Sequence, residues 1–390
     1  MEFNLSKEQA EICRTIRTQA RKELNENVFE DDENSHFSGY KWQICCEMGI
    51  QGLSIPETYG GAGLDMLTTA LAIESLAYAC KDEGLIFSIC AQLCTVAIPL
   101  LHHGTQRQKQ AYLPGISNGK VIGGNAITEP AAGSDPSGML TTVIAKGDGY
   151  ILDGTKLFVT NAPVADLLIV YAKHPNGMKM LDISAFLVEK RNFGLWIGQC
   201  FHKMGLRTSS MSEIVLSDCK VPANALLGKE RRGMEVFNTS MFWERMIMSA
   251  YHIGAMAQQF ETVSAHAHSR KQFGRAINRF SAVSDKLIDM KMRIETSKLL
   301  LYKACWRHDT TGQVRMADAA MVKLYVSEAR VKSSLDAVQI FGAHGYMKES
   351  DVEKQLRDAV AGTIYSGTSE IQRKILTESG TMTSGTMTNG

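Results

Sequence analysis

The apolar residues of this chain change their spacing twice, and this change constrains the fold more than any other feature of the sequence. In the first 120 residues, and again from about residue 232 to 378, they recur at helical spacing in long segments. Between them they come in short runs separated by turn residues, as in strands joined by hairpins. The sequence therefore predicts an α+β protein with an N-terminal α-helical domain (1–120), a middle antiparallel β domain (121–228) and a C-terminal four-helix-bundle-type α domain (229–378).

Two short stretches lack both patterns. Residues 379–390 repeat Ser, Gly, Thr and Met without an apolar period, and we expect a disordered tail there. The acidic stretch Glu30–Glu33 follows the first expected helix, and its composition predicts a loop.

Charge, hydropathy and cysteine content narrow the class of protein. The 42 Lys and Arg residues nearly balance the 41 Asp and Glu residues, so no overall field favours nucleic acid or an anionic membrane as a partner. The apolar run Leu85–Leu101 is short and interrupted by polar residues and Pro99, which predicts a buried helix and no membrane span. The nine cysteines form no CxxC pair, which favours free thiols in a reducing cytoplasm and no metal site.

The stretch Tyr365–Arg373 reads YSGTSEIQR and resembles the IYEGTSEIQR stretch of the acyl-CoA dehydrogenases, flavoenzymes that desaturate acyl thioesters. Other stretches match that family in the same order along nearly the whole chain, namely PETYGGAGL (56–64), ITEP and GSD (127–135), DGTK and VTN (153–161), RKQFGRAI (270–277), and QIFG and HGY (339–346). The resemblance implies the same order of helical, β and helical domains.

The resemblance also implies an FAD cofactor and its contacts. In the family, two of these stretches line the flavin ring, and they transfer to Ile127, Thr128, Ser134, Phe158 and Thr160. Others reach the pyrophosphate and adenosine, partly from a neighbouring subunit, and they transfer to Arg270, Phe273, Gln339, Gly342, Thr368 and Glu370. The family usually has Trp at Phe158 and often has Gln at Ser281, so this chain lacks an indole donor and one expected FAD contact.

The main departure from the family pattern is at the residue that removes the substrate's α-proton. In most of the family it is a Glu directly after the Tyr, where this chain has Ser366, whose hydroxyl cannot accept a proton near neutral pH. One branch, which includes isovaleryl-CoA dehydrogenase, uses a Glu followed by Arg in the first long C-terminal helix, and Glu244-Arg245 matches it. Apolar helical neighbours such as Met241 and Ile247 would raise the pKa of Glu244 toward the range of a general base. The backbone N–H of Ser366 remains as a donor to the thioester carbonyl.

The resemblance further favours a smaller group of the family, which oxidises prolyl groups on acyl or peptidyl carrier proteins in alkaloid and pyrrole pathways. We therefore expect FAD-dependent oxidation of a carrier-bound prolyl thioester to a dehydroprolyl thioester. Two alternatives stay open at this point: a short branched-chain, isovaleryl-type acyl-CoA dehydrogenase, and a flavin-free binding protein that kept the fold. Carrier protein and CoA present the same thioester arm, so residue spacing does not separate them. FAD contacts from a neighbouring subunit imply a homo-oligomer, commonly a dimer of dimers. We expect this oligomer in the cytoplasm.

Overall fold

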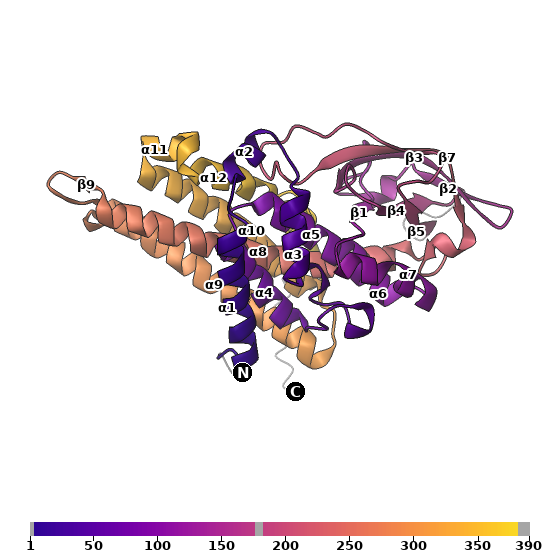
Figure 1. The fold of residues 1–390 in the computed structure, drawn as a ribbon, viewed down its shortest axis with the longest axis horizontal. Coiled ribbons are helices and arrows are strands. Elements are labelled where there is room, and N and C mark those ends of the chain that lie inside the picture. Colours follow the sequence, from indigo (N-terminus) through magenta and orange to yellow (C-terminus); the bar gives the residue numbers. More distant parts are fainter. Residues whose placement is uncertain (1–3, 176–181, 381–390) are drawn as a thin grey trace.

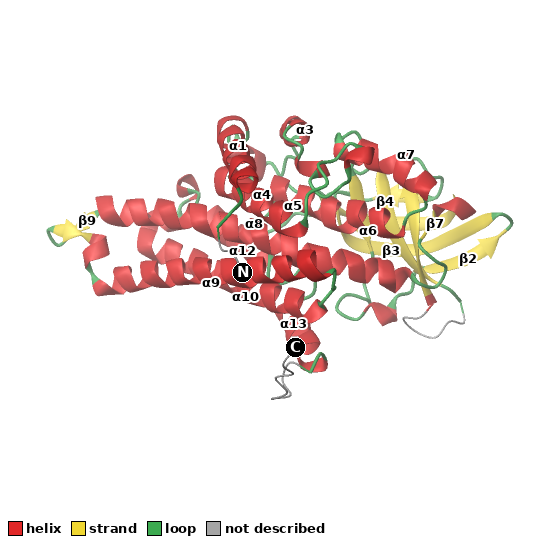
Figure 2. Cartoon of the chain, turned by 90° about the horizontal axis from the view of Figure 1, so that it is seen from below, coloured by secondary structure: helices red, strands yellow, loops and turns green. Residues whose placement is uncertain are grey.

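Helices from both ends of the chain form one body, and a sheet from the middle of the chain lies at one end of it (Figures 1 and 2). The computed structural model describes residues 4–175 and 182–380. The expected order of helical, β and helical parts is confirmed. The predicted disordered tail lies, from residue 381 on, outside the described residues.

The N-terminal part is helical, as its apolar spacing predicts. Its first helix has a capping box, in which Ser6 and Gln9 bond each other's backbone N–H. The segment Glu83–His103 has a mean hydropathy of 2.1, but 94% of its most apolar window is buried, so it is a core helix, as predicted for Leu85–Leu101. The helices are α1 (Lys7–Glu23), α2 (Val28–Glu33), α3 (Gly39–Glu47), α4 (Met66–Ala79), α5 (Glu83–Gln92), α6 (Ile98–His103) and α7 (Gln106–Ser117), with a π-turn joining α5 to α6.

The acidic stretch after the first helix is itself helical, as α2, so the prediction of a loop there is wrong. Its Asp31 carboxylate pairs with the buried Lys41 ammonium at 2.6 Å, and Asp32 pairs with Arg357 at 2.9 Å. Two carboxylates are therefore turned inward, toward cations from elsewhere in the chain, and the composition of the stretch alone does not reveal such partners.

The middle part is a mixed sheet in the order β6-β7-β3-β2-β4-β5-β8, with β1 beside β4. Most neighbours are antiparallel as predicted, but β1 and β2 both pair with β4 in parallel. A register shift between Lys156 and Val159 interrupts the β3–β7 pairing, and such bulges re-aim side chains. The strands are β1 (Gly123–Ala126), β2 (Thr142–Lys146), β3 (Gly149–Thr160), β4 (Leu167–Lys173), β5 (Ile183–Glu189), β6 (Leu195–Ile197), β7 (Met211–Pro222) and β8 (Leu226–Leu227).

The C-terminal part contains three long helices that pack against one another, and the first two of them also pack against α4. A two-stranded hairpin between the first two of them projects from the end of the molecule opposite the sheet (Figure 1). The elements are α8 (Gly233–Ser269), β9 (Lys271–Gln272), β10 (Arg275–Ala276), α9 (Ser281–Thr311), α10 (Met316–Phe341), α11 (Ala343–Tyr346), α12 (Val352–Ala361) and α13 (Ser369–Glu378).

Strand β4 joins the two largest hydrophobic cores of the protein. Its alternate residues point to opposite faces, as in any strand. Leu167, Ile169 and Tyr171 belong to the core shared with the helices, whereas Leu168 and Val170 belong to the core inside the sheet. This double burial fixes the sheet against the helical body, and the cavity described next lies at that junction.

Candidate active site

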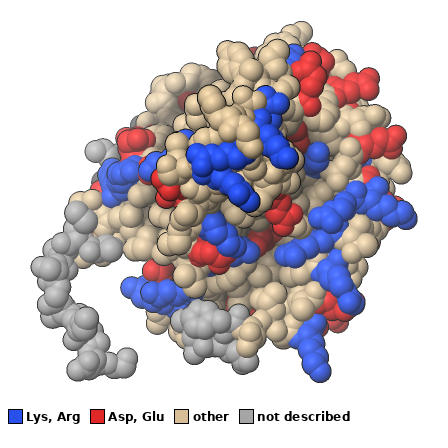
Figure 3. All heavy atoms as spheres, turned by 90° about the vertical axis from the view of Figure 1, so that its left-hand side faces the viewer, with Lys and Arg blue, Asp and Glu red and all other residues tan. Residues whose placement is uncertain are grey.

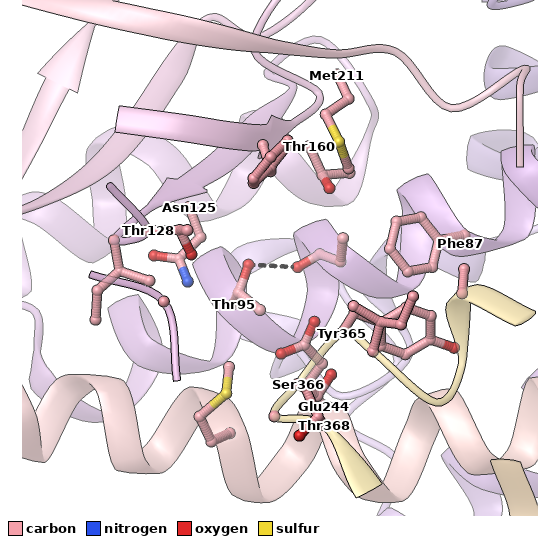
Figure 4. A pocket seen from close by; sticks show the side chains of 18 of the residues that line it. Phe87, Thr95, Asn125, Thr128, Thr160, Met211, Glu244, Tyr365, Ser366 and Thr368 are labelled. Atoms are coloured by element: carbon pink, nitrogen blue, oxygen red, sulfur yellow. Dashed lines mark hydrogen bonds between the residues drawn. The ribbon is translucent and has the colours of Figure 1, made fainter. Parts of the chain in front are cut away.

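A cavity of about 580 Å³ lies where the three parts of the chain meet (Figure 4). One wall comes from α5, another from the ends of β1 and β3, and a third from α8 and the turn before α13. The lining is mainly apolar, with a few hydroxyl and charged groups, as is usual for small-molecule sites. The junction thus brings together side chains from Phe87 to Ile371 in the sequence.

Most of the predicted site residues line this cavity. They come from four separate stretches of the sequence, and they are Ile127, Thr128, Ser134, Phe158, Thr160, Glu244, Ser366 and Thr368. Phe158 has a positive φ of 55°, lies at the β3 bulge and contacts Phe201 with ring centroids 5.6 Å apart.

The remaining predicted residues lie elsewhere in the single chain. Arg270 and Phe273 are on the β9–β10 hairpin, and Phe273 is 92% exposed. Gln339 and Gly342 lie at the end of α10, and the exposed Glu370 is in the first turn of α13. None of these five residues lines the cavity among the described residues.

Glu244 lies in the first half of α8 and is 8% exposed. Burial raises its pKa to about 7, because a carboxylate loses its hydration there. The nearby Ser366 hydroxyl and the charges of Arg245 and Lys323 oppose this shift without cancelling it. Figure 4 shows Glu244 beside Ser366 at the cavity wall. A carboxyl group with this pKa can exchange protons near neutral pH.

The turn at Ser366 and Gly367 is held by donors to its two carbonyl groups. Both residues have positive φ angles, 54° and 87°. Arg245 Nε donates to the carbonyl oxygen of Ser366 at 3.1 Å, and Lys323 Nζ donates to that of Gly367 at 2.7 Å. Gln372 Nε2 donates to both. The N–H of Ser366 has no hydrogen-bond partner within residues 4–175 and 182–380, so it is free to bind a ligand.

An aromatic pair closes another part of the cavity. The rings of Phe87 and Tyr365 are tilted, with centroids 4.9 Å apart, and both line the cavity. The Tyr365 hydroxyl bonds His252 Nε2 at 2.6 Å, and burial lowers the pKa of His252 well below its usual value. The neutral imidazole therefore fixes the Tyr365 ring and with it the start of the Ser366 turn.

A buried ion pair supports the wall at Thr128. Lys156 Nζ is 2.7 Å from Glu129 Oε1 and also donates to the Ile127 carbonyl. Glu129 in turn accepts the N–H groups of Leu140 and Thr141. The pair thus ties strand β3 to the segment that carries Ile127 and Thr128.

Reasoning from the sequence missed Lys156, His252 and Lys323 as parts of the site. A faint signal exists for Lys323, which interrupts the apolar stripe of α10 between Ala320 and Val326. A lysine in such a stripe needs a buried partner, but the sequence does not say which.

The cavity suits a flavin, the group implied by the resemblance. An isoalloxazine ring needs an apolar slot edged by hydrogen-bonding groups. The hydroxyls of Thr128, Ser134 and Thr160 and the ring of Phe158 supply such an edge, and Asn125 Oδ1 is buried there without a partner among the described residues. A Cβ built on Gly133 meets nothing within 4 Å, so the wall is open at that point for a ligand.

A helical body with a mixed sheet at one end, and a flavin-sized cavity between them where a buried carboxylate lies beside an open N–H, define an acyl-thioester-oxidising class of site. The chain belongs to the acyl-CoA dehydrogenase family. Models of that family's N-terminal, middle and C-terminal domains match residues 6–120, 124–219 and 231–381.

Several relatives and solved structures are similar to this chain along nearly its whole length. The chain is 40% identical to the L-prolyl-[peptidyl-carrier protein] dehydrogenase of a Serratia species, over 96% of this chain and 97% of that protein. A crystal structure of the prolyl acyl carrier protein oxidase AnaB shares 41% identity, with a TM-score of 0.94 over 96% of this chain and 99% of AnaB. A structure of PigA with FAD and proline shares 39% identity, with a TM-score of 0.95 over 98% and 100%.

Proposed function

We propose that this protein is an FAD-dependent oxidoreductase that oxidises a prolyl thioester on an acyl or peptidyl carrier protein to a dehydroprolyl thioester. The observation that carries this proposal is the buried Glu244 carboxyl beside the open N–H of Ser366 in the shared cavity. The similar proteins that act on prolyl groups support the choice of substrate.

In this reading Glu244 takes the proton from the prolyl Cα. The N–H of Ser366 donates to the thioester carbonyl and stabilises the negative charge that develops on its oxygen. When bound, FAD supplies the acceptor for the hydride that leaves the ring. The substrate thus loses one proton and one hydride and gains a double bond.

Some residues of the cavity wall would bind the cofactor, and others would contact the substrate. Ile127, Thr128, Ser134, Phe158 and Thr160 would hold the flavin ring. Thr368, at the N-cap of α13, and Glu370 would lie toward the pyrophosphate. A helix N-terminus favours a phosphate group.

Arg270, Phe273, Gln339 and Gly342 would bind the FAD of another copy, because they lie away from the cavity of their own chain. Figure 3 shows the end of the molecule that carries the β9–β10 hairpin, with basic and acidic side chains side by side. The nearly full exposure of Phe273 suits a buried place in a homo-oligomer, for which we propose a dimer of dimers. We further propose that the enzyme is cytoplasmic. Its three domains would span residues 1–120, 121–228 and 229–378.

The rate of flavin reduction should rise with pH through about 7. Glu244 accepts a proton only as a carboxylate, and burial raises its pKa to about 7 in the folded protein. Below that pH the rate should fall about tenfold per pH unit, because the fraction of Glu244 present as carboxylate shrinks by that factor. Anaerobic stopped-flow measurements from pH 5.5 to 9 check this. A flat profile in which the chemical step limits the rate would exclude Glu244 as the base.

The substrate should be identified by the mass of the acyl group. Incubation of the FAD-loaded enzyme with a prolyl-loaded carrier protein should remove two mass units from the prolyl group. Under the same conditions isovaleryl-CoA should stay unchanged or react far more slowly. Loss of two mass units from isovaleryl-CoA alone would assign the enzyme to branched-chain acyl-CoA substrates instead. A purified protein without flavin absorbance would contradict an oxidoreductase of either kind.

A further inference from the structure

The hydroxyl of Ser366 has no part in the roles above, which use only the backbone N–H of that residue. Its Oγ is shielded from solvent, and it makes no hydrogen bond with any residue in the described part of the chain. Ser366 lines the cavity, and its side chain lies beside that of Glu244 (Figure 4). The donors to the carbonyls of Ser366 and Gly367 hold the backbone at this position.

Because the Ser366 hydroxyl lies beside the Glu244 carboxyl, the position of Glu244 determines which part of a ligand the hydroxyl contacts. Glu244 must face the hydrogen on Cα to accept it. A polar group beside the Glu244 carboxyl therefore lies near the other substituents of the same carbon. In a hydrocarbon acyl chain these are CH groups, whereas in a prolyl thioester one of them is the ring nitrogen.

We propose that the Ser366 hydroxyl is a specificity-determining group, which hydrogen-bonds the nitrogen on Cα and so selects amino-acyl thioesters over hydrocarbon acyl thioesters. The inference rests on the proposed function and adds to it the feature of the substrate that is recognised. A hydroxyl both donates and accepts, so it pairs with this nitrogen whether the nitrogen carries one hydrogen or two. A hydrocarbon ligand offers the hydroxyl no hydrogen bond, so its binding lacks this contribution to the free energy.

A second unpartnered acceptor in the cavity, Asn125 Oδ1, does not suit this role. It lies near Thr128, on the wall away from Glu244 (Figure 4). Thr128 is one of the residues proposed above to hold the flavin ring, so this wall would face the cofactor. The Ser366 hydroxyl is therefore the better placed of the two for the substituents of Cα.

The test compares two ligands that differ only at the nitrogen. The ligands are the prolyl and cyclopentanecarbonyl amides of a pantetheine analogue, in which NH replaces the thioester sulfur so that oxidation is suppressed. Their dissociation constants for the FAD-loaded full-length protein are measured from the change in the flavin absorbance spectrum. The wild-type protein should bind the prolyl ligand more tightly. In Ser366→Ala and Ser366→Gly this preference, the ratio of the two constants, should fall about tenfold.

The two variants separate the hydroxyl from the backbone. Both lack the hydroxyl, but glycine adopts the φ of 54° more easily than alanine does. An equal fall in both variants assigns the effect to the hydroxyl. An unchanged preference in both, a fall in Ala alone, or no preference in the wild type would overturn the inference. Failure of the wild type to oxidise the prolyl thioester would instead overturn the proposed function, whatever the ratio of binding constants.

Discussion

Glu244→Gln should lower the rate of flavin reduction by the prolyl thioester by about 10³- to 10⁴-fold, while FAD stays bound. The amide keeps the shape of the side chain and cannot accept the Cα proton, and general-base catalysis contributes about 10²- to 10⁴-fold in enzymes. We place the effect near the top of that range because no other described carboxylate lines the cavity. Anaerobic mixing of the loaded variant with substrate, followed at the flavin absorbance band, measures it.

A matched control lies on the same helix. Glu235 is an exposed carboxylate in the first turn of α8, where it pairs with Arg232 at 3.3 Å. Glu235→Gln makes the same chemical change away from the cavity and should leave the rate within about twofold, as expected for surface substitutions. A Glu244→Gln variant that reduces its flavin at the wild-type rate would move the role of base to another residue. Lost FAD would show instead that Glu244 supports cofactor binding.

Lys156→Met should destabilise the protein by about 3–5 kcal/mol, the usual result of removing one partner from a buried ion pair. Lys156 is fully buried, and its loss leaves the Glu129 carboxylate without its cation. The segment with Ile127 and Thr128 loses one of its ties to β3, so FAD should also bind more weakly. Urea unfolding of the FAD-loaded protein and FAD titration of the stripped protein measure the two effects.

Two further variants show whether the uncompensated charge is the cause. In Glu129→Gln/Lys156→Met both charges are absent, so a good part of the lost stability should return, as it does when buried pairs are replaced together. Lys220→Met removes an exposed lysine from the neighbouring strand β7, where its pair with Asp218 spans 3.5 Å. That change should cost less than about 1 kcal/mol. Equal destabilisation by Lys156→Met and the double variant would show that lost packing, and not the buried charge, is responsible.

The local pattern of the sequence predicts most of the secondary structure. Helical spacing in the two ends and short apolar runs in the middle predict helices such as α1 and α8 and strands such as β4, because each element buries a face of its own residues. The apolar neighbours of Glu244 along α8 also indicate its burial, since residues three and four apart share a helix face.

Partners that are distant in the sequence were not predictable in this way. The acidic stretch of α2 is helical and turned inward because Asp32 meets Arg357, more than 300 residues later in the chain. Strand β1 runs parallel to β4, a pairing that short apolar runs do not encode.

The candidate site, like the fold, could be predicted only in part from the sequence. The sequence by itself determined the family, the residues that match its motifs, and Glu244 as the candidate base in place of Ser366. Only the tertiary structure decided that Glu244 and Ser366 share one wall of the cavity. It also decided that Lys323 and Arg245 together hold the turn at Ser366 and Gly367, and that the Ser366 hydroxyl has no hydrogen-bond partner among the described residues. The physical reason is that pKa values and hydrogen bonds depend on burial and on contacts between residues 44 to 121 positions apart in the chain. The packing of α8, α10 and the turn before α13 creates these contacts.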